Sequence, residues 1–232
     1  MKIAYQHILK NISENPSKDE LSEKFFQLGH EHEIQENIFD MDITPNRGDC
    51  LSLHGLLRDL NVFYEVKTDR SIYEKPISHF DLVFENKVKE FCPKISFLKV
   101  EIDEIPKEYN DILESYFSYL DIKKNNFFTD LSNYISYETG QPTHCYDSKS
   151  IGNKIILNKL KNHCQFETLI NKKINITEDE LVFMNDNEQV INLAGVIGGK
   201  NTACNNSTKS VIIECAYFLP EIILGKTLKH NI

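Results

Sequence analysis

The stretch DITPNRGDCLSLHGLLRDL, residues 42–60, decides the N-terminal part of the fold. A strand is expected to end at Ile43, where a proline-containing turn follows. A helix is expected to begin near Asp49, because leucines recur beyond it at helical spacing: Leu53, Leu56, Leu57 and Leu60. Asn46 and Arg47 therefore lie near a turn between a strand and a helix. There Asn46 can bond the turn backbone and Arg47 can form a local salt bridge.

A second helix signal precedes this stretch, over residues 17–29. Ser17 can cap the helix, and Glu20, three residues later, completes a capping box. Apolar residues fall on one face of it, and Gly29 suits its end. These signals indicate an N-terminal part that is rich in helices.

Polar residues without a period occupy residues 65–79, which makes this segment the best linker candidate. Beyond it we expect a strand over residues 95–102 and a strongly amphipathic helix over residues 109–120. After these come short β-rich runs separated by turn residues: KIILNKL, DELVFMN, EQVINLAGV and SVIIECAYF. The sequence therefore predicts an α+β fold, with a small helical domain over residues 1–70. A mixed α+β domain with a strand-rich C-terminal half is predicted over residues 80–232.

The composition argues against several classes of protein. Hydrophobic residues make up 41% of the chain, which suits a real core, and there is no apolar run of about 18 residues for a membrane span. The N-terminus lacks the apolar stretch of a secretory signal, so we expect a cytoplasmic protein. A net charge of −9 disfavours nucleic-acid binding through the whole surface, so any RNA contact needs a local patch or a larger complex. None of the six cysteines forms a CxxC pair, and neither a zinc site nor a disulfide scaffold is expected.

Four positions attract attention from their residue types alone. Glu214 lies in an apolar run, so it is either buried with a partner or faces solvent from an alternating strand. His144 follows a glycine and a proline, which favours a turn that exposes its ring to a water molecule. A plain surface-loop histidine is the alternative. Gly198 and Gly199 allow a ligand to approach the backbone closely, and their N–H groups could bind an oxyanion; a tight turn is the alternative.

Four motifs together resemble one family. Residues 42–60 resemble its D-[IL]-T-P-N-R-x-D-x-L-S segment, and GQPTHCYD, residues 140–147, looks like its G-Q-P-x-H-x-[FY]-D. NLAGVIGG, residues 192–199, and SVIIECAYFLPEII, residues 210–223, are similar to its A-G-[VI]-x-G-G and V-x-L-E-x-A-x-F-x-P. All four occur in the family's order at about its spacing. The chain thus resembles the N-terminal part of the bacterial phenylalanine–tRNA ligase β subunit.

This resemblance implies an editing module that hydrolyses mischarged Tyr-tRNA(Phe). It implies that Glu214 recognises the tyrosine hydroxyl, that His144 is the editing histidine and that Gly198 and Gly199 contact substrate. Lys123 takes the place of an arginine that is common in the family, so it keeps the charge but loses bidentate recognition. The implied partners are the ligase α subunit and tRNA(Phe), and ATP and magnesium are expected at the α subunit. No cofactor or metal is expected in this chain, which also lacks G-x-x-x-x-G-K-[ST] and G-x-G-x-x-G motifs.

Two departures from the family keep an alternative open. Between Gly29 and Asp42 the usual oligonucleotide-binding insertion is absent. The family also continues beyond the equivalent of Ile232 with further domains, and the threonine and alanine that line its tyrosine pocket would fall there. The alternative is a non-catalytic structural or RNA-binding segment of the same subunit, and a chance match by an unrelated α+β domain is a third. For an editing site, His144, Gly198 and Glu214 should converge on one cleft.

Overall fold

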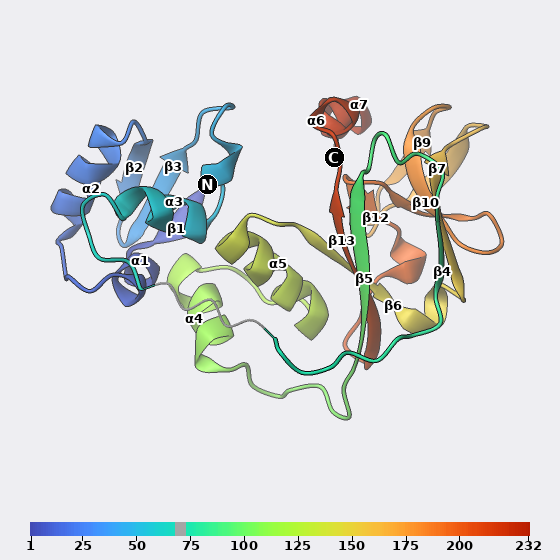
Figure 1. Cartoon of the computed structure of the whole chain (residues 1–232), viewed down its shortest axis with the longest axis horizontal. Helices are drawn as coiled ribbons and strands as arrows, with labels where there is room; N and C mark the ends of the chain where they lie inside the picture. Colours follow the sequence, from blue (N-terminus) through green and yellow to red (C-terminus); the bar gives the residue numbers. More distant parts are fainter. Residues whose placement is uncertain (68–72) are drawn as a thin grey trace. The chain divides into compact units, whose positions relative to one another are not determined.

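The computed structural model describes residues 1–67 and 73–232. The linker predicted over residues 65–79 includes residues 68–72, which lie outside the described part. Backbone contacts divide the chain into two compact units. Each unit is built from three segments, and the segments of the two units alternate along the sequence. The first unit comprises Met1–Pro76, Pro106–Asn125 and Asp130–Pro142; the second comprises Ile77–Ile105, Asn126–Thr129 and Thr143–Ile232. Helices and sheets occur in both units, which confirms the predicted α+β class (Figure 1).

The first unit combines helices with a small antiparallel sheet. Its helices near the N-terminus are α1 (Tyr5–Asn11) and α2 (Lys18–Gln27). The predicted capping box of α2 is present, because the Glu20 N–H donates to Ser17 Oγ at 3.2 Å and the Ser17 N–H donates to Glu20 Oε2 at 2.6 Å. Gly29 follows the helix with a φ of +82°, a conformation that glycine adopts at little cost.

The sheet of the first unit has the strand order β1-β3-β2. It consists of β1 (Lys2–Ala4), β2 (Glu31–Gln35) and β3 (Ile38–Asp42). The strand expected to end at Ile43 is β3, which ends one residue earlier. The other two strands add a sheet to the helices predicted for this region. Strand β2 was hard to predict, because its residues, EHEIQ, are nearly all exposed and carry no apolar alternation.

Helix α3 (Leu53–Leu60) buries all four leucines that predicted it. It begins later than Asp49 because residues Gly48–Cys50 form a 3₁₀ turn, η1, and the Ser52 hydroxyl then caps the α-helix.

The first unit also contains α4 (Asp111–Leu120) and most of α5 (Phe127–Thr139). The predicted domain over residues 80–232 included both helices, so the compact units differ from the predicted domains. The physical reason is that these helices bury aromatic side chains against N-terminal residues. The Tyr137 hydroxyl, for example, lies 2.7 Å from His7 Nδ1.

The second unit is rich in strands, as the sequence predicts. Its largest sheet has the order β12-β11-β10-β7-β4, in which only the β4–β7 pair is parallel. These strands are β4 (Val83–Asn86), β7 (Lys154–Lys159), β10 (Leu181–Met184), β11 (Val190–Leu193) and β12 (Ile197–Gly198). Between β7 and β10 in the sequence, β8 (Cys164–Glu167) and β9 (Lys173–Ile176) pair as an antiparallel hairpin.

A three-stranded antiparallel sheet completes the second unit. In it, β13 (Ser210–Tyr217) lies between β5 (Lys94–Glu101) and β6 (Thr143–Asp147), and η2 (Ser148–Ser150) follows β6 (Figure 1). Apolar side chains of both sheets share one core, which includes Tyr146, Ile155, Leu157, Phe183 and Ile212. A short 3₁₀ turn, η3 (Lys200–Thr202), precedes β13 in the sequence. The short helices α6 (Pro220–Ile223) and α7 (Lys226–His230) follow β13. In the described part of the chain, no helix has the length and apolar character needed to cross a membrane.

Candidate functional site

The second unit brings together three residues that lie up to 70 positions apart in the sequence. His144 on β6 and Glu214 on β13 are direct cross-strand partners. Gly198 on β12 packs against the His144 ring so closely that a Cβ atom there would lie 2.2 Å from His144 Cε1. The structure therefore places His144 next to both Glu214 and Gly198, while the predicted cleft and the roles of the three residues stay predictions.

Glu214 is buried, with 6% of its surface exposed, so the alternative of a solvent-facing glutamate is wrong. Its Oε2 accepts a hydrogen bond of 2.6 Å from the hydroxyl of Tyr146 on β6. That hydroxyl in turn accepts one of 2.8 Å from Nδ2 of Asn192 on β11. Burial raises the pKa of the Glu214 carboxyl to about 7, although the bond from Tyr146 opposes this rise. Near neutral pH this carboxyl therefore exists in both its charged and its neutral form.

His144 lies on strand β6 rather than in an exposed turn or a surface loop, so both sequence-based placements of its ring are wrong. The ring packs edge-on against Tyr146 with centroids 4.3 Å apart, and Nε2 is buried without a hydrogen-bond partner among the described residues. Burial lowers the pKa of His144 to about 4. The imidazole is therefore neutral at pH 7. Oδ1 of Asn192 is likewise buried without a hydrogen-bond partner among the described residues.

The two glycines differ in what their backbone atoms do. Gly198 leaves the space that the imidazole of His144 fills. The Gly199 N–H donates to Ile191 O at 2.8 Å, so the predicted use of this N–H for an oxyanion does not fit the structure. A side chain at Gly199 would meet Ile191 O at 2.8 Å and the Phe166 ring at 3.0 Å, which makes Gly199 a packing position.

Lys123 lies in the first unit, on the exposed segment between α4 and α5. The other predicted site residues belong to the second unit. The contact of Lys123 with substrate therefore stays a prediction.

Sequence reasoning missed Tyr146 and Asn192. A signal for Tyr146 was available, because residues two apart on a strand point to the same face and Tyr146 is two positions after His144. Asn192 opens the quoted motif NLAGVIGG and pairs with Gly198 across β11 and β12. Its hydrogen bond to Tyr146 could not be anticipated, since it joins strands of two different sheets.

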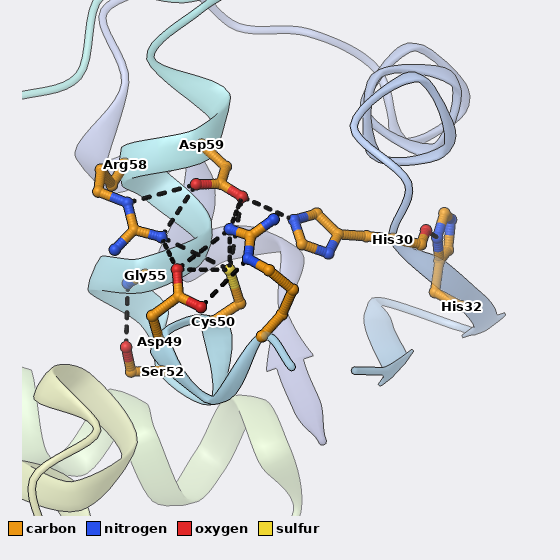
Figure 2. Close-up of polar contacts among 9 residues, drawn as sticks. His30, His32, Asp49, Cys50, Ser52, Gly55, Arg58 and Asp59 are labelled. Atoms are coloured by element: carbon orange, nitrogen blue, oxygen red, sulfur yellow. Dashed lines mark hydrogen bonds and ion pairs between the residues drawn. The ribbon is translucent and has the colours of Figure 1, made fainter. Parts of the chain in front are cut away.

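A second polar cluster surrounds the DITPNRGDC segment in the first unit (Figure 2). Arg47 donates to Asp59 Oδ2 at 2.5 Å and to both oxygens of Asp49 at 3.1 Å, which confirms its predicted local salt bridge. Arg58 adds ion pairs to the same two carboxylates, and His30 Nε2 lies 3.0 Å from Asp59 Oδ2. These partners lower the pKa of Asp59 to about 2, against the effect of burial.

Three residues of this cluster have the spacing of metal ligands: His30, Cys50 and Asp59 offer ligand atoms within 4.8 Å of one another. The guanidinium of Arg47 lies among them, at 2.8 Å from Cys50 Sγ and 2.5 Å from Asp59 Oδ2. A positive charge thus already neutralises the carboxylate, and burial raises the pKa of the Cys50 thiol to about 12. We interpret the cluster as a structural ion-pair network, and the expected absence of a metal stays a prediction.

Comparison with known proteins connects these observations to named relatives. A family model described as the B3/4 domain matches residues 100–232. The phenylalanine–tRNA ligase β subunit of Wolbachia sp. subsp. Brugia malayi is 29% identical over 97% of this chain and 31% of that protein. The β subunit from Fusobacterium nucleatum is 30% identical over 82% of this chain and 24% of that protein. The chain thus spans about a quarter to under a third of the length of these relatives.

Among solved structures, an N-terminal fragment of the phenylalanyl-tRNA synthetase β subunit from Pyrococcus horikoshii matches with a TM-score of 0.49 and 15% identity. The match covers 95% of this chain and 69% of that fragment.

Proposed function

Because the chain belongs to the B3/4 domain family, we propose that it forms the tRNA-editing part of the β subunit of a phenylalanine–tRNA ligase. In this proposal it hydrolyses the ester of tyrosine that has been attached wrongly to tRNA(Phe). One observation carries the proposal: buried Glu214 accepts a hydrogen bond from a phenol hydroxyl, at 2.6 Å from Tyr146. Its cross-strand partner His144 has a buried Nε2 without a hydrogen-bond partner among the described residues.

Glu214 supplies the discrimination in this proposal. Tyrosine differs from phenylalanine by one hydroxyl, and an apolar pocket rejects an added hydroxyl by only about 100-fold. A buried carboxylate acts in the opposite sense, because it bonds the phenol and is left without that partner by phenylalanine. Leaving a buried acceptor unpaired costs about 1–3 kcal/mol. The editing site therefore favours the ester that the synthetic site should have rejected.

His144 holds the attacking water. The water oxygen bonds to the ester carbonyl carbon, the bond from that carbon to the ribose oxygen breaks, and a proton of the water ends on the ribose oxygen. With its pKa lowered to about 4, His144 is a weak base at pH 7, so orienting the water is its main contribution. Gly198 leaves room for the ring, and Lys123 offers a positive charge to the tRNA.

The remaining parts of the proposal concern the assembly. The α subunit and tRNA(Phe) are the proposed partners, within a heterotetramer in the cytoplasm. ATP and magnesium belong to the α subunit in this proposal.

A structural or RNA-binding role without catalysis is the second candidate. The internal bond of Tyr146 favours it, because this phenol already uses one oxygen of Glu214. The occupied N–H of Gly199 favours it too, since one expected oxyanion donor is bonded within the sheet.

Hydrolysis of Tyr-tRNA(Phe) and of Phe-tRNA(Phe) by a full-length β subunit that contains this chain separates the two candidates. The editing proposal expects faster release of tyrosine, and Glu214→Ala should abolish the preference. Glu138→Ala is the matched control, because Glu138 also accepts a phenol at 2.6 Å, from Tyr134 in the first unit. Equal rates for both esters in the wild-type chain would favour the structural role.

A further inference from the structure

Tyr146 presents a fully buried phenol to the carboxylate of Glu214. A phenol has a single proton to donate, and here that proton goes to Glu214 Oε2 at 2.6 Å. The oxygen of the phenol then accepts from Asn192 Nδ2 at 2.8 Å. The chain of donors therefore runs in one direction, from Asn192 through Tyr146 to Glu214. Oε2 must act as an acceptor, so a proton bound by the carboxyl would lie on Oε1.

The three residues of this chain come from three strands. Tyr146 and Glu214 lie on β6 and β13 of the three-stranded sheet, and Asn192 lies on β11 of the larger sheet. Their backbone positions are fixed by ladder hydrogen bonds, so the side chains have little freedom to move. The chain therefore fixes the carboxylate from a rigid base, as a preorganised site requires.

We propose that Tyr146 and Asn192 are positioning residues for Glu214: they occupy Oε2, fix the plane of the carboxylate and leave Oε1 to bind the phenol of the tyrosyl ester. This inference rests on the proposed editing function. It assigns the discrimination between tyrosine and phenylalanine to a chain of three side chains rather than to Glu214 alone.

The surroundings of Glu214 support this assignment. The titratable groups near it are Tyr146 and His144 from β6, the thiol of Cys92 and, next to it on β13, the thiol of Cys215. Among the described residues, no lysine or arginine forms an ion pair with Glu214. Burial raises the pKa of both thiols, so they stay neutral near pH 7. The bond from Tyr146 is thus the main interaction that favours the charged carboxylate, and it lowers the pKa of Glu214 against the effect of burial.

Two further atoms indicate that a polar group binds beside the hydrogen-bonded side chains of Asn192, Tyr146 and Glu214. Nε2 of His144 and Oδ1 of Asn192 are both buried and unpartnered among the described residues. His144 contacts the Tyr146 ring, and Asn192 bonds its hydroxyl. Since buried polar groups are usually satisfied, these two mark the place where a hydroxyl or a water of the substrate complex would bind.

Tyr146→Phe tests the proposal, because it removes one hydroxyl and keeps the ring that packs in the core. The pKa of Glu214, followed by NMR on chain labelled at its glutamate carboxyl carbons, should rise by about one unit when the stabilising bond is lost. The ionised fraction at pH 7 should then fall about fivefold, and the pH profile of Tyr-tRNA(Phe) hydrolysis should move to higher pH by the same unit. Asn192→Leu should cause a smaller shift in the same direction.

Tyr134→Phe is the matched control, because its hydroxyl donates to Glu138 at the same distance of 2.6 Å. It should leave both the pKa of Glu214 and the pH profile unchanged. An unchanged pKa of Glu214 in Tyr146→Phe would overturn the positioning role, even if the wild-type chain prefers the tyrosyl ester. A shifted pKa in a chain without ester preference would keep the positioning role and reject the editing function.

Discussion

Two clusters of this molecule hold a carboxylate away from water and give it opposite properties. In the first unit, Asp59 accepts from Arg47, Arg58 and His30, and its pKa falls to about 2. In the second unit, Glu214 accepts from one uncharged phenol, and its pKa rises to about 7. Burial opposes the charge in both places, so the difference comes from the cations. A carboxylate paired with arginine is permanently charged, whereas one paired with a phenol changes its charge near neutral pH.

This difference separates a structural cluster from a candidate chemical one. The Asp59 network joins the turn at Arg47 to helix α3 and to His30. The low pKa of Asp59 keeps this carboxylate charged between pH 4 and 9. Glu214 is the cross-strand partner of His144. Two buried polar atoms of this cluster, His144 Nε2 and Asn192 Oδ1, have no hydrogen-bond partner among the described residues. Perturbed pKa values of this kind are typical of sites that bind or transform a substrate.

The largest expected effect comes from breaking the Asp59 cluster of the first unit. Asp59→Ala removes the common acceptor of Arg47, Arg58 and His30, and leaves the Arg47 charge without its partly buried partner. We expect a loss of about 4 kcal/mol in the free energy of unfolding, measured by chemical denaturation. Glu101→Gln is the control, because Glu101 pairs with Lys99 on the exposed surface, where water screens the ion pair, and its loss should change stability little. A loss as small as that of the control would show that the network is not structural.

The Glu214 cluster of the second unit can be tested through the pH dependence of the free energy of unfolding. The folded-state pKa of Glu214 lies above its ordinary value of 4.5, so the folded chain holds this proton between pH 4.5 and about 7. Its contribution to stability is complete below pH 4.5 and is lost as the pH rises through 7. Glu214→Gln cannot titrate, so relative to wild type it should gain about 3 kcal/mol between pH 4.5 and 8. Denaturation curves at both pH values measure this gain, and a constant difference would contradict the raised pKa.

The close packing that buries the second cluster can be changed at Gly198. A methyl group there would lie 2.2 Å from His144 Cε1, so Gly198→Ala must displace the imidazole. Such overpacking is expected to cost about 2 kcal/mol of stability, and to slow ester hydrolysis as the ring moves. Gly48→Ala is the control, since no atom lies within 4 Å of the added methyl and the change should stay within about 0.5 kcal/mol. Equal stability of the two variants would mean that the imidazole does not fill the space above Gly198.

The smallest expected change in stability distinguishes Arg47 from Arg58, the two arginines of the Asp59 cluster. Arg58 is 54% exposed and Arg47 is 33% exposed. Arg58→Gln should therefore cost less than about 1 kcal/mol, because water screens and replaces its ion pairs. Arg47→Gln should cost more, since Arg47 is less exposed and lies 2.8 Å from Cys50 Sγ, whereas Arg58 lies 3.6 Å from the same atom. The reverse order would assign the low pKa of Asp59 to Arg58.

Local structure followed from the sequence wherever a short segment carried its own signal. Ser17 and Glu20 fixed the start of α2, and the four leucines after Ser52 fixed the buried face of α3. Strand β2 was missed because its side chains are polar and exposed, so hydrogen bonding to β3 is what makes it a strand. The placement of α4 in the first unit was also missed, because an amphipathic helix reveals that it has a buried face but not what covers that face.

The candidate site divides in the same way. The sequence determined which residue types are present: a glutamate in an apolar run, a histidine in GQPTHCYD and a glycine pair after a strand. Only the tertiary structure decided that Glu214 lies opposite His144 and that the imidazole packs against Gly198. It also decided that Tyr146 donates to the carboxylate while Asn192 donates to the Tyr146 hydroxyl. The physical reason is that strand register and burial depend on segments far apart in the chain. Whether a buried carboxyl is charged depends in turn on which partners that register brings within hydrogen-bonding distance.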